Sequence, residues 1–136
     1  MARQEIKSFE EFWPFYVSEH SKPATRALHA AGTTAATACA VALIATGRWR
    51  LLPLALIPGY AAAWVGHFFV EHNKPASFKY PLWSFVADYK MFGMMLTGKM
   101  EEQVEQSRAR MKVVLTSLYT ATWYYYCAPM HIDRLF

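Results

Sequence analysis

This chain of 136 residues lacks several features of secreted and soluble proteins. It has only two cysteines, Cys39 and Cys127, each within an apolar stretch, so neither a disulfide framework nor a zinc ribbon is available. Its start, MARQEIKSFEEFWPFY, is charged and aromatic and lacks the apolar core of a secretory signal. Charged residues make up only 18% of the chain, whereas 54% are hydrophobic and 16% aromatic. This balance favours a protein that lies partly in a membrane.

Charge is also absent from two long runs of the sequence. ALHAAGTTAATACAVALIAT covers Ala27–Thr46, and LLPLALIPGYAAAWVGHFFV covers Leu51–Val70. A helix of about twenty apolar residues crosses the hydrocarbon core of a bilayer, and the polar stretch Gly47–Arg50 provides a turn between the two runs. The sequence therefore predicts an all-α integral membrane protein, a helical bundle without β-sheet around this transmembrane hairpin. Pro58 and Gly59 should kink the second helix or make it begin late.

The segments that flank the hairpin are more polar and predict amphipathic helices at the membrane surface. Ser8 and Glu11 have the spacing of a capping box that begins a short helix, and Ser18–Ala24 forms a polar break after it. Beyond the hairpin we expect an interfacial or re-entrant segment, a charged helix and a short third membrane helix, at Leu82–Thr97, Lys99–Lys112 and Val113–Ala128. We expect the whole chain, residues 1–136, to form a single membrane-embedded helical domain.

The distribution of basic residues predicts how the hairpin is oriented. More of them flank its two ends than its turn: Arg3, Lys7, Lys22, Arg26, Lys74 and Lys79 against Arg48 and Arg50. Because positive charge is retained on the cytoplasmic side, both ends should face the cytoplasm. The net charge of +4 comes without a basic run interleaved with aromatics, so we expect attraction to anionic lipid and no nucleic-acid partner. Small residues such as Gly32 permit close helix packing, either within one chain or within a homo-oligomer.

The five histidines are the most informative feature of the chain, and they are too few for the clustered histidine boxes of membrane di-iron hydroxylases and desaturases. His29 and His67 lie equally far from the hairpin turn, so an antiparallel hairpin brings them to one depth. Glu71 follows His67 by one helical turn on the same face, while His72 is displaced around the helix. His20 lies in the incoming loop on the same side. Such imidazoles with a carboxylate suit Fe(II), Zn(II) or Mn(II).

The residues alone leave two interpretations of this cluster open. The histidines bind a metal ion, or they only pair polar atoms within a helical interface and its adjoining loops. Arg26, one turn before His29, either holds a substrate carboxylate or reaches toward lipid headgroups. Asp88 and Lys90, which interrupt the apolar stretch after the hairpin, either pair with the histidines or lie on a solvated helix face.

Two longer stretches contain these histidines: His20–His29, HSKPATRALH, and Gly66–Ala76, GHFFVEHNKPA. Together they resemble the signatures of the 2-hydroxy-palmitic acid dioxygenase family, and Tyr80–Trp83, YPLW, followed by Asp88 is similar to its bacterial branch. The resemblance implies an Fe(II)-dependent dioxygenase that works without 2-oxoglutarate. Such an enzyme shortens 2-hydroxy fatty acids by one carbon in α-oxidation.

The resemblance also implies roles for individual residues. It assigns catalytic iron ligation to His20, His29 and His67, with Glu71 or His72 as a further ligand or as a partner of one. The implied partners are a lipid or fatty-acid substrate and O₂. The implied location is an integral membrane position with the site near the cytoplasmic face, in the inner membrane of a bacterium or the endoplasmic reticulum of a eukaryote. The competing hypothesis is a non-enzymatic lipid-binding or structural membrane bundle whose histidines take up metal without turnover.

Overall fold

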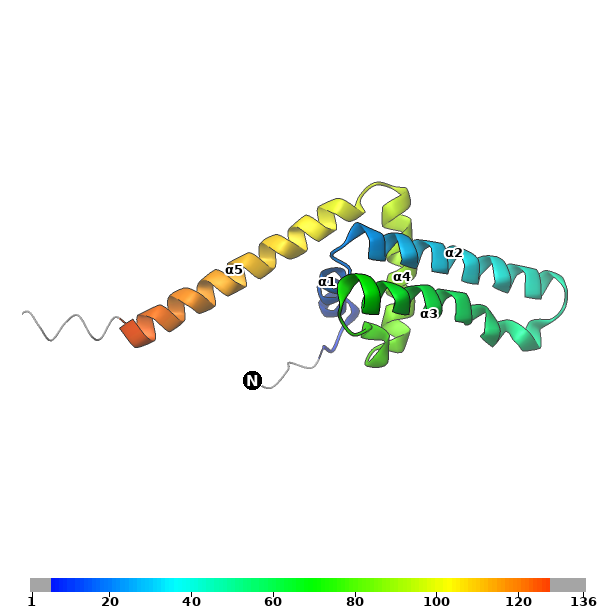
Figure 1. Ribbon diagram of the computed structural model, residues 1–136, viewed down its shortest axis with the longest axis horizontal. Coiled ribbons are helices and arrows are strands. Elements are labelled where there is room, and N and C mark those ends of the chain that lie inside the picture. Colours follow the sequence, from blue (N-terminus) through cyan, green and yellow to red (C-terminus); the bar gives the residue numbers. More distant parts are fainter. Residues whose placement is uncertain (1–5, 128–136) are drawn as a thin grey trace, which may run out of the picture. The chain divides into compact units, whose positions relative to one another are not determined.

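The computed structural model describes residues 6–127, and all regular structure in this range is helical (Figure 1). The α-helices are α1 (Phe9–Glu19), α2 (Pro23–Ala45), α3 (Leu56–Val65), α4 (Pro81–Leu96) and α5 (Met100–Cys127). Three short segments join them: the 3-10 helices η1 (Trp49–Ala55) and η3 (Ala76–Phe78) and the π-helix η2 (Gly66–Glu71). No strand occurs between residues 6 and 127, which confirms the predicted all-α class.

The predicted hairpin is present, with α2 running antiparallel to the segment Trp49–Glu71 (Figure 1). Gly47 follows the end of α2 with a φ of 70°, a left-handed conformation that a residue without a Cβ adopts at no steric cost. On the return side the α-helix begins only at Leu56, after the 3-10 turns of η1. Pro58 therefore lies in the first turn of α3, where its missing N–H breaks no helical hydrogen bond. The late start expected from Pro58 is thus confirmed.

The two arms of the hairpin approach each other most closely at Gly32. A Cβ added to Gly32 would lie 2.8 Å from the Cβ of Ala62 and 3.1 Å from the carbonyl oxygen of Gly59. About two turns nearer the open end, a Cβ added to Gly66 would lie 3.1 Å from the methyl carbon of Thr25. Small residues thus let α2 and the returning arm pack within a single chain.

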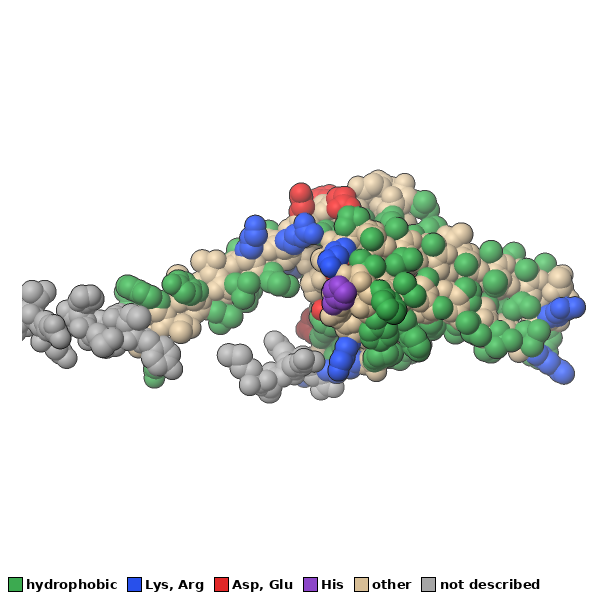
Figure 2. Space-filling view, in the orientation of Figure 1, with side chains coloured by type: hydrophobic (Ala, Val, Ile, Leu, Met, Phe, Trp, Pro, Cys, Tyr) green, Lys and Arg blue, Asp and Glu red, His purple; other side chains and the backbone are tan. Residues whose placement is uncertain are grey.

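Most of the hairpin's apolar surface lies outside the protein core. Both arms are 23 residues long and apolar enough to cross a membrane, and only 17% and 22% of their apolar windows are buried. The core helix of a soluble protein would instead be mostly buried. Hydrophobic side chains cover the hairpin in the space-filling view, with basic side chains at its tip (Figure 2). This exposure supports membrane association.

The main hydrophobic core lies beside the open end of the hairpin, among α1, α4 and the beginning of α5. Its buried members are Phe12, Trp13, Tyr16, Val17, Ala76, Ala87, Met91, Met100 and Val104. The hydroxyl oxygen of Ser8 accepts the N–H of Glu11 at 3.2 Å, so the predicted cap of α1 is confirmed. The Lys90 ammonium lies 4.0 Å from the centre of the Trp13 ring, which places this lysine on the core and away from the histidines.

The C-terminal part of the described chain corrects one prediction. Separate helices were expected over Lys99–Lys112 and Val113–Ala128, but α5 runs without interruption through Met100–Cys127, and Ala128 lies outside the described residues. No glycine or proline occurs in MEEQVEQSRARMKVVLTSLYTATWYYYC, so the helix continues where composition changes from charged to apolar. One compact unit ends at Val104 and a second begins at Glu105, where the rest of α5 is mostly exposed. The single membrane-embedded domain stays a prediction.

The close contact at Gly32 predicts a specific loss of stability. Gly32→Ala should lower the free energy of unfolding by about 1–3 kcal/mol, because the new methyl group must displace Ala62 and α3. Gly93→Ala is the matched control, since Gly93 lies in α4 and an added Cβ would meet nothing within 4 Å. That change should be neutral or stabilising by about 0.5–1 kcal/mol. Thermal unfolding in detergent, followed by circular dichroism, compares the two. Equal stability would contradict the contact.

Candidate metal centre

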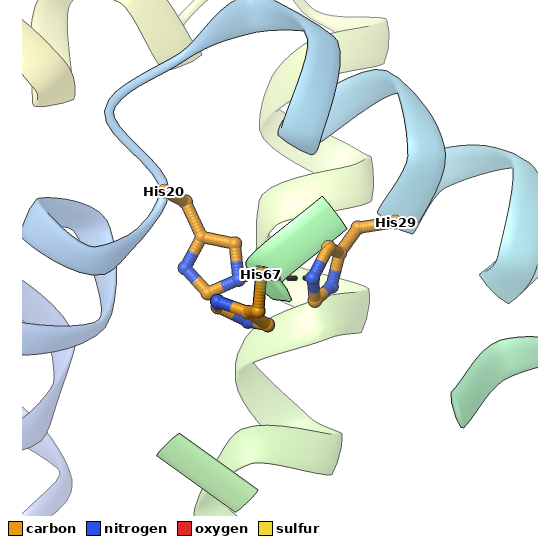
Figure 3. Close-up of side chains that lie close together, drawn as sticks. All are labelled: His20, His29 and His67. Carbon is orange, nitrogen blue, oxygen red and sulfur yellow. Dashed lines mark hydrogen bonds between the residues drawn. The ribbon is translucent and has the colours of Figure 1, made fainter. Parts of the chain in front are cut away.

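Three histidines from three different elements meet near the open end of the hairpin. His20 ends α1, His29 lies in the second turn of α2, and His67 lies in η2. All three are buried, with 0%, 4% and 2% of their surface exposed. Their rings converge (Figure 3), and the Nε2 atoms of His20 and His29 are 3.2 Å apart. One ligand atom from each lies within 4.8 Å of the others, which confirms that His29 and His67 share one depth.

Each imidazole is held by a hydrogen bond through its Nδ1 atom. The three contacts run from His20 to the carbonyl oxygen of Tyr16 at 2.6 Å, from His29 to Oδ1 of Asp88 at 2.9 Å, and from His67 to Oδ1 of Asn73 at 2.8 Å. A carbonyl oxygen and a carboxylate only accept hydrogen bonds, so each Nδ1 must donate. In the neutral rings every Nε2 therefore carries a lone pair.

The orientation of the Asn73 amide is fixed independently. Its Nδ2 group donates to the carbonyl oxygen of Glu19 at 3.0 Å and to the carboxylate of the same residue at 2.8 Å. The amide oxygen must then face His67, which makes it the acceptor. At His29 the carboxylate of Asp88 also accepts a short hydrogen bond from the Tyr16 hydroxyl. Two of the three imidazoles are thus oriented by side chains that have further partners of their own.

The convergence of these lone pairs fits a divalent metal ion. Two imidazole nitrogens that face each other at 3.2 Å without a hydrogen between them repel, and a cation between them removes the repulsion. Ligands about 2.1 Å from one ion have nitrogens about 3.0–3.4 Å apart, so the His20–His29 separation matches. Burial is the main cause that lowers the pKa of His20 well below its usual value, and His29 and His67 lower it further, which disfavours a proton as that cation. Neutral imidazoles suit Fe(II), Zn(II) and Mn(II).

Glu71 lies at the edge of this centre and makes its contacts elsewhere. Its carboxylate accepts the backbone N–H of Lys22 at 2.6 Å and the hydroxyl of Ser21 at 3.1 Å. A negative charge is favourable at this position, the N-terminus of α2. His72, next in sequence, is exposed and adopts a left-handed φ of 60°. Among the described residues the group that can hold an ion contains neither side chain, and their role as ligands stays a prediction.

Arg26 is buried behind the loop that carries His20. Its guanidinium donates to the carbonyl oxygens of His20 and Ser21, both at 3.0 Å, and pairs with the carboxylate of Glu101 at the start of α5. Only 2% of Arg26 is exposed, so its charge does not reach outward from this site. These contacts hold the loop in place, and the binding of a substrate carboxylate by Arg26 stays a prediction.

A cavity of about 50 Å³ borders all three histidines and extends between α2, α3 and α4. Asp88 lies in its wall, so the open question of whether this carboxylate joins the cluster is answered by the contact with His29. Two contributors to the centre were missed from the sequence: the Tyr16 carbonyl and Asn73. A backbone carbonyl leaves no signal in a sequence. Asn73 could have been found, because it is a polar residue within the stretch Gly66–Ala76 that also contains His67.

The sequence matches a known protein family. The family described as 2-hydroxy-palmitic acid dioxygenase Mpo1-like matches residues 6–100, a range that contains all three histidines, Asn73 and Asp88. No curated protein and no solved structure matches the chain. The family match therefore bears on the whole candidate centre and on most of the described chain.

The geometry predicts which histidines bind metal. His20→Ala, His29→Ala and His67→Ala should each abolish tight binding of one divalent ion, because only two imidazoles then remain. His131→Ala is the control: no sequence spacing connects this residue to the cluster, and the variant should keep the parent's metal content. Purified variants reconstituted with Fe(II), Mn(II) or Zn(II) are compared by elemental mass spectrometry. Parental metal content in all three alanine variants would exclude these histidines as ligands.

Proposed function

Because the chain belongs to the 2-hydroxy-palmitic acid dioxygenase Mpo1-like family, we propose that it is an Fe(II)-dependent dioxygenase that shortens 2-hydroxy fatty acids by one carbon. The match includes both histidine-containing stretches and confirms the resemblance drawn from them. The observation that carries the proposal is the buried group of His20, His29 and His67, in which one ligand atom from each residue lies within 4.8 Å of the others. Three neutral ligands leave positions of an iron ion free for other oxygen or nitrogen donors.

The residues around the centre have distinct tasks in this proposal. A ferrous ion held by the three histidines supplies the electrons and the Lewis acidity that chemistry with O₂ requires. The carboxylate of Asp88 accepts a hydrogen bond from Nδ1–H of His29, which fixes the ring and makes its Nε2 a stronger ligand for a metal. Burial, together with the negative charge of Asp88, raises the pKa of Tyr16 well above its usual value. The phenol therefore stays protonated and continues to donate to that carboxylate.

The membrane placement follows from the exposed hairpin. We place α2 and Trp49–Glu71 across the bilayer, with both ends on the cytoplasmic side and the centre near that face. A fatty acid dissolved in lipid then reaches the histidines without crossing water. The hairpin would lie in the inner membrane of a bacterium or the endoplasmic reticulum of a eukaryote.

Turnover separates this function from that of a non-enzymatic metal-binding bundle. The iron-loaded parent should convert 2-hydroxy-palmitic acid and O₂ into a product one carbon shorter, whereas a lipid-binding or structural bundle would take up metal and leave the acid unchanged. Asp88→Asn should lower turnover about 10- to 100-fold, because the carboxylate that orients His29 is weakened. Lys90→Gln, two residues further on and packed on Trp13, should retain parental turnover. Product analysis by mass spectrometry decides, and an iron-loaded parent that leaves the acid intact would exclude the enzyme.

Orientation is tested by labelling single cysteines. In a background of Cys39→Ser and Cys127→Ser, a membrane-impermeant maleimide added from the cytoplasmic side should label Lys74→Cys and leave Arg48→Cys unlabelled, because a hairpin places its ends and its turn on opposite sides. Detergent permeabilisation should then expose both. Labelling of Arg48→Cys from the cytoplasm in intact vesicles would contradict the orientation.

A further inference from the structure

We propose that the cavity beside the histidines receives the oxygenated head and first carbons of one acyl chain, that Ser84 binds this head, and that the rest of the acyl chain follows the seam between α2 and α3 toward the hairpin turn. This inference rests on the proposed function, since the acyl chain is that of the 2-hydroxy acid that the iron centre would shorten. It adds the path of the chain and a residue that positions the head.

The seam begins at the metal centre and runs toward the hairpin turn. Its walls carry small side chains from both arms: Thr33 and Ala36 from α2, Gly59 and Ala63 from α3. Each pair lies about one and two turns beyond the histidine of its own arm, so the four positions line one continuous furrow. At about 1.5 Å of rise per residue, the wall from His29 to Ala36 is about 10 Å long.

The composition of the wall changes along the furrow in the way an acyl chain requires. Asp88 and Ser84 join the histidines in the wall, whereas Ala36 and Leu56, the wall positions farthest from the histidines along their arms, are apolar. The rings of Tyr60, Phe85 and Tyr89 also line the cavity. The two arms lie close together along this furrow, because a Cβ added to Gly59 would be in van der Waals contact with the Cβ of Ala36 at 3.4 Å, so larger side chains at these positions would fill it. A site with one polar end and a narrow apolar extension fits a single alkyl chain that carries a polar head.

Ser84 is a buried polar side chain in this wall whose hydroxyl makes no hydrogen bond within the described chain. It is 5% exposed, and its Oγ has no hydrogen-bond partner among the residues the structure describes. A buried hydroxyl without a partner is unfavourable, and a serine in a helix commonly satisfies itself by donating to a carbonyl of the preceding turn. Ser84 lies one turn before Asp88 on the same face of α4, and Asp88 contacts His29. Its hydroxyl is therefore placed to donate to a carboxylate or hydroxyl oxygen held beside the metal centre.

The head contact is tested by removing and restoring this hydroxyl. Ser84→Ala should weaken equilibrium binding of radiolabelled 2-hydroxy-palmitic acid to the iron-loaded protein about tenfold, the usual effect of losing one hydrogen bond to a charged or strongly polar group. Iron content should not change, because Ser84 does not contact an imidazole. Ser84→Thr keeps the hydroxyl and should restore most of the affinity. Binding by Ser84→Ala equal to that of the parent would overturn the assignment.

The path of the chain is tested by narrowing the furrow. Ala36→Leu should weaken binding of 2-hydroxy-palmitic acid much more than binding of 2-hydroxy-octanoic acid, because only the longer chain must pass the new side chain. Ala35→Leu is the matched control, since Ala35 is exposed on the same helix and should leave both affinities unchanged. If Ala36→Leu does not fold, Ala63→Leu blocks the furrow from the facing helix. An unchanged chain-length preference in the folded variant would refute the path.

The two proposals fail in different ways. A parent protein that binds 2-hydroxy-palmitic acid but does not shorten it under O₂ would refute the dioxygenase and leave the acyl site in place. A parent that shortens the acid, with Ser84→Ala and Ala36→Leu variants that bind and turn over both chain lengths as the parent does, would refute only the acyl site.

Discussion

Three buried imidazoles that meet at one point form the constraint on which the rest of the structure depends. Bringing them together requires the end of α1, the second turn of α2 and the π-helix η2 to meet at one point. Glu71 ties the end of η2 to the start of α2, and Arg26 holds the loop that carries His20. The charged residues nearest the centre thus maintain its geometry. Such a set of buried polar groups is stable only when each member has a partner, and a divalent metal ion would be a suitable partner for the three imidazoles.

The protein meets this constraint with two kinds of packing. Beside the open end of the hairpin, α1, α4 and the first turn of α5 form a core of large aromatic and methionine side chains. Within the hairpin, the arms touch through small residues such as Gly32, and their large side chains point outward. A helix pair of this kind gains little from the hydrophobic effect in water, whereas in lipid close backbone contact is a main source of association. Packing through large side chains in the core and through small residues in the hairpin fits a protein whose hairpin is surrounded by lipid and whose other helices cover the candidate metal centre.

Much of this arrangement was predictable from the sequence because it depends on counting residues. Two uncharged runs and a short turn define the hairpin, and equal distances from the turn bring His29 and His67 to one depth. His20 was placed on the same side because it lies in the loop that leads into the hairpin, and the family resemblance then implied its role as a ligand. The hydrogen bonds behind the imidazoles were not predictable, because they join residues far apart in sequence, as from His29 to Asp88, or use a backbone carbonyl, as at Tyr16. The continuity of α5 was missed because composition was given more weight than the absence of glycine and proline.

The direction of the seam connects the chemistry of the centre to the membrane. The histidines lie near the open end of the hairpin, and the furrow lined by Ala36 and Gly59 runs from them toward the turn. If the arms cross the bilayer, that direction leads from the headgroup region into the hydrocarbon core. A fatty acid in the cytoplasmic leaflet has the same orientation, with its carboxylate at the interface and its chain pointing inward. Such a substrate would enter without inverting, so its polar head would move sideways at constant depth to the iron and its chain would exchange lipid neighbours for the walls of the seam.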